Sequence, residues 1–483
     1  MSFFKEVTAS LDLDGPTDIP RHPLTGISVL IVGAGPAGLY TALECWRKGH
    51  SPRVIDRTPS PSPAGDSFMM GPSAQQHIER TWPALYAASL KTAPDPWMSF
   101  HKVTGEKVAG PQPFSFNKDG VVLFNEDGEP APDRVFRVSR PKFTAALLGQ
   151  ALALGVDVSF GQRVIDYFED ENKGGVILED GSKMDADVVV AADGLGTKSH
   201  KLINGHEIRA MSSNHSILRT AYHVDNFITH PELDKAFPLR EDGGALLQIW
   251  TADDIQIMVL RAPDTIQWHI MHNDIAGNSK ESWSNHVSPE YVVDFLKENY
   301  PDVPDYLYKL IRTAPQDAII DWQLMWRDPQ PNWTSPLGRV VQVGDSAHTF
   351  LPSSGNGAVQ GIEDAVSLAT CLELGGGMKN AWFCQFELVG FINQTNFLKP
   401  ESRKKTAGGS ATPQPEYGHW IWAHNPERYA YENYGKALRN VVDGTPFQNT
   451  NIPPGYHYKP WTLHELYEKI EAGEKLEFEG DWS

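Results

Sequence analysis

The pattern of apolar and polar positions predicts a strand, a helix and a second strand near the start of the chain. Residues 27–32 (ISVLIV) form a short apolar run rich in β-branched residues, which is typical of a buried parallel strand. A helix is expected over 36–48, capped by Gly49, and another strand over 51–56. Together these segments predict one βαβ unit with a right-handed crossover.

The pattern changes after residue 245. The segments ALLQIW, IQIMVLRA and TIQWHIMH alternate apolar and polar residues and are separated by turn-like Asp-Asp and Pro-Asp pairs. They predict an antiparallel sheet with one wetter face. Elsewhere the pattern predicts short strands up to Ala192, a buried strand over 339–343, and helices over 141–154, 289–313 and 357–374.

The parallel elements flank the antiparallel segment, which indicates that a sheet domain is inserted into a nucleotide-binding domain. We expect an α/β fold in which residues 25–200 and 320–400 form a discontinuous Rossmann-like domain. Residues 201–319 are expected to form the antiparallel-sheet domain that binds the substrate. Residues 401–483 are expected to form a mostly helical or irregular C-terminal extension.

The turn after the first strand carries the first candidate chemistry. It reads Gly33-Ala34-Gly35-Pro36-Ala37-Gly38, a GxGxxG motif between a predicted strand and a predicted helix. In this motif Gly33 permits the tight turn, Gly35 lets the backbone approach a pyrophosphate, and Gly38 lets the helix pack on the sheet. The helix N-terminus offers oriented N–H groups to the phosphates. The motif predicts a dinucleotide site.

An acidic residue follows at the spacing that such a site needs. Asp56 lies 18 residues beyond Gly38, at the end of the second strand, where its carboxylate can accept both ribose hydroxyls. A carboxylate there disfavours a 2′-phosphate, but Arg57 follows it directly. Because FAD and NAD both present this ribose, the turn alone does not choose between them.

Two later motifs carry a resemblance to a known family. One strand ends in Asp193-Gly194 and another in Gly344-Asp345, and the latter is followed by Pro352 and by Gly355-Asn356-Gly357-Ala358-Val359-Gln360-Gly361-Ile362-Glu363-Asp364-Ala365. With the glycine turn, this order resembles the single-component FAD-dependent aromatic hydroxylases of the para-hydroxybenzoate hydroxylase fold. Trp326-Arg327-Asp328-Pro329 looks like their salicylate hydroxylase-like branch, common in fungal secondary metabolism.

The resemblance implies a cofactor contact for each matching position. Asp345, after Gly344, would bind a ribityl hydroxyl of FAD, and Arg140 would contact the middle of the cofactor. Asp193 and Gly194 would serve the motif that touches both FAD and NAD(P)H. The isoalloxazine ring would be lined by Pro352, Gly355, Asn356, Gly357 and Ala358. The alternatives are a helix cap for Asp345, a surface ion pair for Arg140 and a turn for Asp193.

The sequence departs from the family pattern at a few positions. The usual DGxxSxxR motif has Thr197 in place of its serine and His200 in place of its arginine. Threonine keeps a hydroxyl, but histidine is mostly neutral at pH 7. The choice between NADH and NADPH is therefore left open.

The candidate catalytic residues are Arg219, Tyr222 and Pro352. Arg219 matches the family's Tyr-Arg-Gly position, where a cation can stabilise a phenolate or steer oxygen transfer. Its alternative is an ion pair within the sheet. Further pocket candidates are Gln248, Trp250, Trp268 and His269, and His269 is more often a hydrogen-bonded structural residue. Gln248 and Trp250 share one sheet face, although the sequence does not say which face meets the pocket. The loop 65–68 is a candidate moving wall or a plain surface loop.

The family's chemistry, as the resemblance implies it, is an NAD(P)H-dependent monooxygenation. NAD(P)H would reduce FAD, O2 would add at flavin C4a, and the hydroperoxide would hydroxylate or epoxidise an electron-rich phenol or indole. The chain has no second GxGxxG in a strand–helix context and no CxxC pair for metal or redox chemistry. An FAD-dependent oxidase or reductase on the same fold, or a non-catalytic flavin-binding protein, are the alternatives.

Composition narrows the partners. The formal net charge is −19, which argues against nucleic acid and anionic membrane surfaces as partners. Three cysteines are too few for a disulfide framework, and we expect Cys45 and Cys371 to be buried thiols. With no apolar run long enough to span a membrane and no secretion signal in residues 1–23, we expect a cytoplasmic monomer or homodimer.

Overall fold

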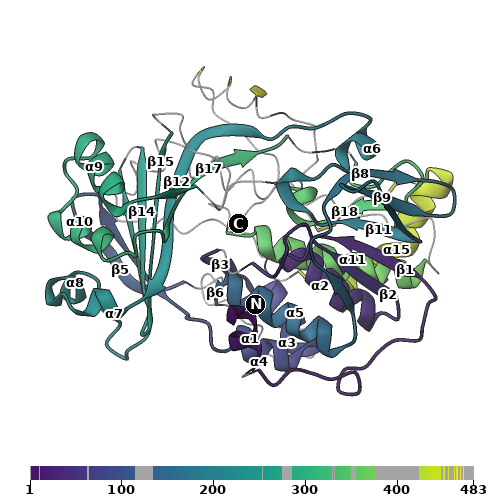
Figure 1. The fold of residues 1–483 in the computed structure, drawn as a ribbon, viewed down its shortest axis with the longest axis horizontal. Helices are drawn as coiled ribbons and strands as arrows, with labels where there is room; N and C mark the ends of the chain where they lie inside the picture. The colour runs from purple at the N-terminus through teal and green to yellow at the C-terminus, as the bar shows by residue number, and fades with distance from the viewer. Residues whose placement is uncertain are drawn as a thin grey trace.

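A computed structural model of the chain describes residues 2–9, 11–62, 65–114, 134–252, 254–274, 285–328, 330, 332–349, 355–375, 422 and 424–447, with scattered positions from 450 to 472. These residues form two lobes, each built on its own sheet (Figure 1). One lobe contains a parallel sheet and two long helices, each of which begins directly after a glycine-rich turn. The other contains a broad mixed sheet.

The parallel sheet has five strands in the order β18-β11-β1-β2-β7, and each neighbouring pair is parallel. The strands are β1 (Ser28–Val32), β2 (Ser51–Ile55), β7 (Asp157–Ser159), β11 (Val188–Ala191) and β18 (Val340–Gln342). Helix α2 (Pro36–Arg47) connects β1 to β2, and Gly49 follows it with a φ of +82°, a conformation that favours glycine. The predicted βαβ unit is therefore present.

Alternate strand residues bury the two faces of this sheet in different cores. Val29, Ile31 and Val190 pack with α2, α5 (Arg140–Ala153) and α11 (Gly357–Leu374). Leu30, Val32, Val189 and Ala191 pack on the other face, against a small antiparallel sheet. Its strands are β8 (Val164–Glu169), β9 (Gly174–Leu178) and β10 (Lys183–Ala186). The remaining helices of this lobe are α1 (Ser2–Ala9), α3 (Pro72–Thr81), α4 (Pro83–Ser89), α6 (His200–Asn204) and α15 (Pro426–Asp443).

The second lobe contains an eight-stranded sheet in the order β16-β17-β12-β15-β14-β13-β4-β5. Its strands are β4 (Trp97–Lys102), β5 (Lys107–Pro113), β12 (Met211–His223), β13 (Leu246–Thr251), β14 (Ile255–Arg261), β15 (Thr265–Asn273), β16 (His286–Val287) and β17 (Ile319–Trp326). The predicted antiparallel hairpins are confirmed at β13, β14 and β15. β4 and β5 come from within residues 25–200, however, and β13 pairs with β4 in parallel, so the expected boundary at residue 201 does not follow the strands.

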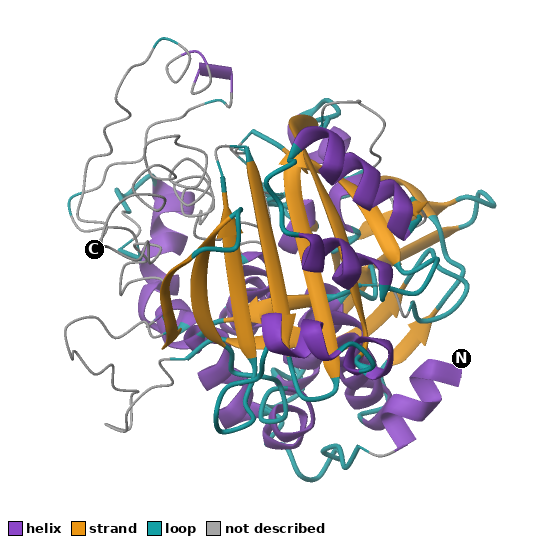
Figure 2. Ribbon diagram, turned by 90° about the vertical axis from the view of Figure 1, so that its left-hand side faces the viewer, coloured by secondary structure: helices purple, strands orange, loops and turns teal. Residues whose placement is uncertain are grey.

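Helices cover one face of the eight-stranded sheet. They are α7 (Asp225–Ile228), α8 (Pro231–Ala236), α9 (Pro289–Asn299) and α10 (Asp305–Arg312), and Figure 2 shows helices in front of the strands from that side. Residues 289–313 thus form two helices rather than one. Tyr300 precedes Pro301, which disfavours a helical conformation at Tyr300, and its φ of −136° ends α9 there.

A short antiparallel ribbon lies between the two lobes. It consists of β3 (Ser67–Met70) and β6 (Phe136–Ser139), with Ser67 opposite Ser139 and Met69 opposite Arg137. Figure 1 shows it beside the broad sheet and next to α5. Phe68, Met70 and Val138 pack into the core of the first lobe, so the other face of the ribbon is turned toward the second lobe.

Cys45 and Cys371 are buried free thiols, as expected. In the described part of the chain, no helix combines the length and the hydropathy needed to cross a membrane.

Candidate flavin site

The three motif turns meet at one edge of the parallel sheet. They follow β1, β11 and β18, which are neighbours in that sheet, and the carboxyl ends of parallel strands share an edge. The first turn needs glycine on steric grounds. A Cβ at Gly33, whose φ is +116°, would lie 2.3 Å from the Ala192 carbonyl oxygen, and a Cβ at Gly38 would lie 2.0 Å from that of Gly33.

Gly35 differs from its two neighbours in the motif because a Cβ there would meet no atom within 4 Å. The surface above Gly35 is therefore open where the motif predicts that a pyrophosphate approaches. Helix α2 starts at Pro36, and Gly35 gives its first turn no side-chain cap. The N–H groups of Ala37 and Gly38 thus point along the helix start without a capping partner, as a phosphate-binding helix requires. These residues fit the diphosphate of FAD.

Asp56 stands beside this turn, as predicted, and it supports the turn directly. Its carboxylate accepts hydrogen bonds from the Ala34 N–H at 2.8 Å and from the Thr58 N–H and hydroxyl at 2.7 and 2.6 Å. A carboxylate offers about four acceptor sites, so one site remains for a ribose hydroxyl rather than two. Arg57 faces the turn after β11, because its Nη1 lies 3.8 Å from a Cβ built at Gly196.

The turns after β11 and β18 are bonded to each other. Ser346 donates its hydroxyl hydrogen bond to the Asp193 carboxylate at 3.2 Å and accepts one from the Gly194 N–H at 2.8 Å. The Tyr167 hydroxyl donates to the other oxygen of Asp193 at 2.9 Å. Burial raises the pKa of the Asp193 carboxyl, and these donors oppose that rise. Asp193 therefore links the two cofactor turns through its side chain.

Gly344 and Asp345 lie against the start of α2. A Cβ at Gly344, whose φ is +58°, would lie 2.9 Å from the Cβ of Ala37, and the Gly344 N–H donates to Asp364 at 2.8 Å. Asp345 is exposed, and its carboxylate accepts no hydrogen bond from the described residues. An exposed, unoccupied carboxylate beside the phosphate turn fits a ribityl hydroxyl.

Arg140 is brought next to Asp345, as the resemblance implies. It is the first residue of α5, its N–H donates to the Asp66 carbonyl oxygen at 2.7 Å, and its Cδ lies 3.0 Å from a Cβ built at Gly65. Burial lowers the pKa of the Arg140 guanidinium, and the charge of Asp345 counteracts this effect. Arg140 is thus a half-buried residue that faces the turn carrying Asp345.

The last motif starts helix α11. Gly355 has a φ of +64°, and a Cβ there would lie 2.8 Å from the Met69 sulfur. Asn356 is the N-cap residue and is buried, Gly357 and Ala358 form the first turn, and no side-chain cap bond is made at Asn356. Pro352 lies outside the described residues.

A buried charge cluster faces these turns from the eight-stranded sheet. Arg219 on β12 binds both carboxylate oxygens of Asp66, with its Nε 2.6 Å from Oδ2. His269, opposite Arg219 on β15, places its Nε2 2.7 Å from the same oxygen. Burial favours the neutral Asp66 carboxyl, but Arg219 and His269 hold its pKa well below the usual range. Burial also lowers the pKa of His269, so its ring is neutral at pH 7.

Tyr222 lies on the opposite face of the same strand, so its prediction as a catalytic residue is wrong. Its hydroxyl bonds to Thr313 at 2.7 Å and to the Leu310 carbonyl oxygen at 3.3 Å, in the core under helix α10. Side chains alternate along a strand, so residues 219 and 222 point to opposite faces. Gln248, Trp250 and Trp268 share the helix-covered face with Tyr222, because Trp250 and Trp268 belong to that core and Gln248 bonds to Ala236 and Trp250.

The contacts of Asp66 also argue against the expectation that the loop 65–68 is a moving wall. Asp66 is held by Arg219 and His269. The next residue, Ser67, begins strand β3, and its hydroxyl donates a hydrogen bond to Gln267 at 2.7 Å. This segment is therefore fixed between the lobes by buried polar bonds. The sequence pointed to Arg219 and His269 singly and to Asp66 only as part of the loop 65–68. It did not show that they meet, because Asp66 lies 153 positions before Arg219.

Comparisons with known proteins agree with this geometry. The family model described as FAD binding domain matches residues 26–375. The FAD-dependent monooxygenase fsr3 of Gibberella fujikuroi is 40% identical over 480 residues, which cover 96% of this chain and 91% of that protein. The chain belongs to the FAD-dependent monooxygenase family.

Solved structures share the fold. CtdE in complex with FAD and a substrate is 25% identical, with a TM-score of 0.70 over 86% of this chain and 100% of that one. A salicylate hydroxylase substrate complex is 19% identical, with a TM-score of 0.56 over 88% of this chain and 100% of that one. The expected flavoprotein hydroxylase fold is confirmed, and the family model supports FAD binding.

His200 stands at the arginine position of the family's DGxxSxxR motif, but it does not supply the positive charge of that arginine. His200 is buried, and its Nδ1 lies 3.1 Å from the Gln342 amide nitrogen. Burial, together with the charge of nearby Arg327, lowers the pKa of His200 to about 4, so the ring is neutral at pH 7. Arg327 itself donates to the Leu195 carbonyl oxygen and to the Thr349 hydroxyl, the latter at 3.2 Å. A guanidinium thus holds the turn after β11, but from the residue that follows β17 rather than from α6.

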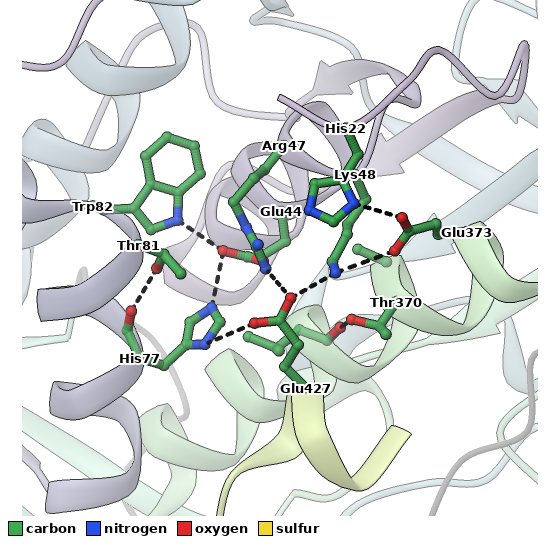
Figure 3. A network of polar contacts seen from close by, with 12 residues as sticks. His22, Glu44, Arg47, Lys48, His77, Thr81, Trp82, Thr370, Glu373 and Glu427 are labelled. Carbon is green, nitrogen blue, oxygen red and sulfur yellow. Dashed lines mark hydrogen bonds and ion pairs between the residues drawn. The ribbon is translucent and has the colours of Figure 1, made fainter. Parts of the chain in front are cut away.

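The C-terminal segment is tied to the flavin lobe by a buried ionic network (Figure 3). Arg47 Nη2 lies 2.6 Å from a Glu44 oxygen and 2.9 Å from a Glu427 oxygen, and Lys48 Nζ lies 2.5 Å from Glu427 and 3.1 Å from Glu373. Burial would raise the pKa of Glu44, but Arg47 and His77 hold it well below its usual range. The network fixes the start of α15 against α2, α3 and α11.

This anchoring bears on the site because the residues before α15 reach the second lobe. The Trp422 ring covers Gly71, where a Cβ would lie 2.0 Å from Cζ3. It is buried with Leu247 and Leu260, which lie on the inner face of the eight-stranded sheet. The expected C-terminal extension therefore contributes to the contact between the lobes.

Proposed function

We propose that the chain uses NAD(P)H and O2 to hydroxylate or epoxidise an electron-rich aromatic molecule of the phenol or indole type. The observation that carries this proposal is the buried Asp66–Arg219–His269 cluster, which lies on the sheet face turned toward the flavin turns. A fixed buried guanidinium is suited to hold developing negative charge on an oxygen. The alternatives of an oxidase or a binding protein give this cluster no task.

FAD, when bound and reduced, supplies the chemistry that activates O2. The chain's residues bind and orient it. We propose that Gly35, Ala37 and Gly38 bind the diphosphate, that Asp56 and Arg57 face the adenosine, and that Asp345 and Arg140 bind the central portion. Gly355, Asn356, Gly357, Ala358 and Pro352 would line the ring. The positive end of α11 would then favour negative charge on the reduced ring.

The inner face of the sheet would exclude water and position the substrate. Arg219 is oriented by two bonds to Asp66, which leave its guanidinium a single orientation. His269 is neutral at pH 7 and cannot compete with Arg219 as a cation. Water exclusion matters because it prevents loss of activated oxygen before transfer.

Relatives support the biological setting. The relatives at 36–40% identity are all named FAD-dependent monooxygenases and come from fungi such as Gibberella fujikuroi and Emericella nidulans. We propose a place in fungal natural-product biosynthesis. A cytoplasmic location and a monomer or homodimer remain part of the proposal.

The test is oxygen incorporation. Purified holoprotein would be screened with phenols and indoles for accelerated NADH and NADPH oxidation, and each positive reaction repeated under 18O2. The proposal predicts one labelled oxygen atom in the product. Substrate-dependent NAD(P)H oxidation that yields only hydrogen peroxide, with an unlabelled organic product, would establish an oxidase or reductase instead.

A further inference from the structure

Arg137 is a buried arginine that the cofactor turns leave unused. It lies on β6, it is 9% exposed, and its Nε is buried without a hydrogen-bond partner in the described part of the chain. Burial lowers the pKa of its guanidinium, and the nearest opposite charge, Asp66, counteracts this only in part. Asp66 is already bonded to Arg219 and His269. Burying an unpaired cation is costly, so its retention calls for a ligand.

The β3–β6 ribbon shows where the Arg137 side chain points. Cross-strand partners in an antiparallel pair project from the same face, and Arg137 is opposite Met69 while Ser139 is opposite Ser67. Ser67 bonds to Gln267 on the inner face of the large sheet, and the Met69 sulfur lies 2.8 Å from a Cβ built at Gly355. Arg137 therefore projects between the sheet and the turn that begins α11.

The charge in this space is positive. Arg137 and Arg219 interact electrostatically with each other and with Asp66, and His269 beside them is neutral at pH 7. Among these described groups, two guanidinium charges face one carboxylate. Asp66 holds Arg219 in place through a bidentate pair, whereas Arg137 makes no ion pair with the described residues and keeps its donors for a ligand anion.

We propose that Arg137 binds an anionic oxygen on the aromatic substrate, a phenolate or a ring carboxylate. The inference rests on the proposed function, since it places the substrate between the sheet and the flavin ring. It narrows the substrate class to aromatics that carry such an oxygen, and it assigns specificity to a residue outside the family's motifs. Neutral aromatics of the same size would bind this space weakly.

The test uses binding rather than turnover. FAD-loaded wild type, Arg137→Gln and Arg137→Lys would be titrated with 4-nitrophenolate, with benzoate and with neutral benzamide, following the flavin absorbance. Arg134→Gln is the matched control, because Arg134 lies three positions away on the same segment and pairs with Asp95 instead. Wild type and the control should bind 4-nitrophenolate or benzoate more tightly than benzamide. Arg137→Gln should lose about 10- to 100-fold in anion affinity and none for benzamide.

The two anions distinguish the source of the charged oxygen, since a site built for a phenolate prefers 4-nitrophenolate and one built for a ring carboxylate prefers benzoate. Arg137→Lys keeps a cation but loses the planar fork, so it should bind anions with intermediate affinity. Unchanged anion binding by Arg137→Gln would overturn the inference. Absence of anion binding by wild-type holoprotein would overturn it as well.

Thermal unfolding separates a ligand-binding arginine from a structural one. Because Arg137 has no ion pair with the described residues, Arg137→Gln should keep its FAD and unfold at the same or a higher temperature than wild type. Loss of flavin from this variant would show that Arg137 binds the cofactor. A lower unfolding temperature would show that Arg137 stabilises the fold. Either result contradicts the inference. Wild type that inserts labelled oxygen without Arg137-dependent anion binding contradicts this inference alone. Anion binding without oxygen insertion contradicts only the proposed function.

Discussion

At the scale of single residues, the site depends on which carboxylates are already bonded. Of about four acceptor sites each, Asp56 uses three and Asp193 uses two for hydrogen bonds within the protein. Asp345 is exposed, and its carboxylate accepts no bond from the described residues. Binding energy for the ribityl chain should therefore come from Asp345 more than from the other two acids.

Asp345→Asn should weaken FAD binding without unfolding the protein. A hydrogen bond to a charged acceptor contributes about 1.5–3 kcal/mol, so the affinity for FAD should fall about 10- to 100-fold. Flavin fluorescence titration of the apoprotein measures the change, with the exposed Asp254→Asn as control. Wild-type affinity in Asp345→Asn would show that Asp345 does not contact FAD.

Glu363 provides a residue-scale test of pH dependence. It is buried on α11 and accepts a hydrogen bond from the Ser73 hydroxyl at 2.6 Å, and burial raises its pKa from 4.5 to about 8. Between pH 4.5 and about 8, the Glu363 carboxyl therefore stays protonated in the folded state but is ionised in the unfolded chain. The stabilisation is therefore complete below pH 4.5 and is lost as the pH rises through about 8.

Glu363→Gln keeps the neutral shape and removes the titration. Above pH 8 the variant should exceed wild type in free energy of unfolding by on the order of 5 kcal/mol, and the two should converge toward pH 4.5. Urea unfolding at several pH values measures this, with the exposed Glu298→Gln as control. Parallel pH profiles for wild type and Glu363→Gln would mean that Glu363 is already ionised in the fold.

At the scale of elements, local pattern predicted the segments that pack with their sequence neighbours. The strand–helix–strand unit at 27–56 and the helices at 141–154 and 357–374 match the structure within one or two residues. The same period-2 pattern showed that the sheet has two faces but not which one meets the flavin, so Tyr222 was assigned to the wrong face. That choice depends on α9 and α10 covering one side.

Long-range pairing was the other feature that local pattern could not supply. β4 joins β13 in parallel although the two strands are more than a hundred residues apart. The Asp66–Arg219 ion pair could not be predicted for the same reason, because the two residues meet only when the ribbon packs on the sheet. Residues of the glycine turns were found because their function requires a fixed spacing within one segment. Arg137 and Asp66 have no such spacing.

The ionic network that anchors α15 gives a prediction at this scale. Lys48 is buried, and its Nζ lies between Glu427, Glu373 and the Tyr431 hydroxyl. Lys48→Met removes a buried cation from Glu427 and Glu373, and although Glu427 keeps Arg47, the free energy of unfolding should fall by about 3 kcal/mol.

The control for Lys48→Met is Arg428→Met on the exposed face of α15. Arg428 pairs with Glu432 one turn along, and such a surface pair should contribute only about 0.5 kcal/mol. Urea denaturation of both variants measures the difference. Equal, small losses would mean that the network does not hold α15 in place.

At the scale of the whole molecule, the two lobes divide the work. The parallel sheet brings turns from β1, β11 and β18 to one edge, although these segments span more than three hundred positions of the chain. The eight-stranded sheet presents Arg219 and His269 to the same edge, and the β3–β6 ribbon and Trp422 lie between the lobes. The whole chain has a net charge of −19, whereas Arg137, Arg140 and Arg219 gather near Asp66 between the lobes.

The most direct test of this account is the flavin content of the purified full-length protein. The three turns form a single site, so reconstitution with excess FAD followed by desalting should give one FAD per chain, measured from the visible spectrum and the protein concentration. Protein that stays colourless under these conditions would contradict the assignment of the turns, and with it the monooxygenase chemistry built on them.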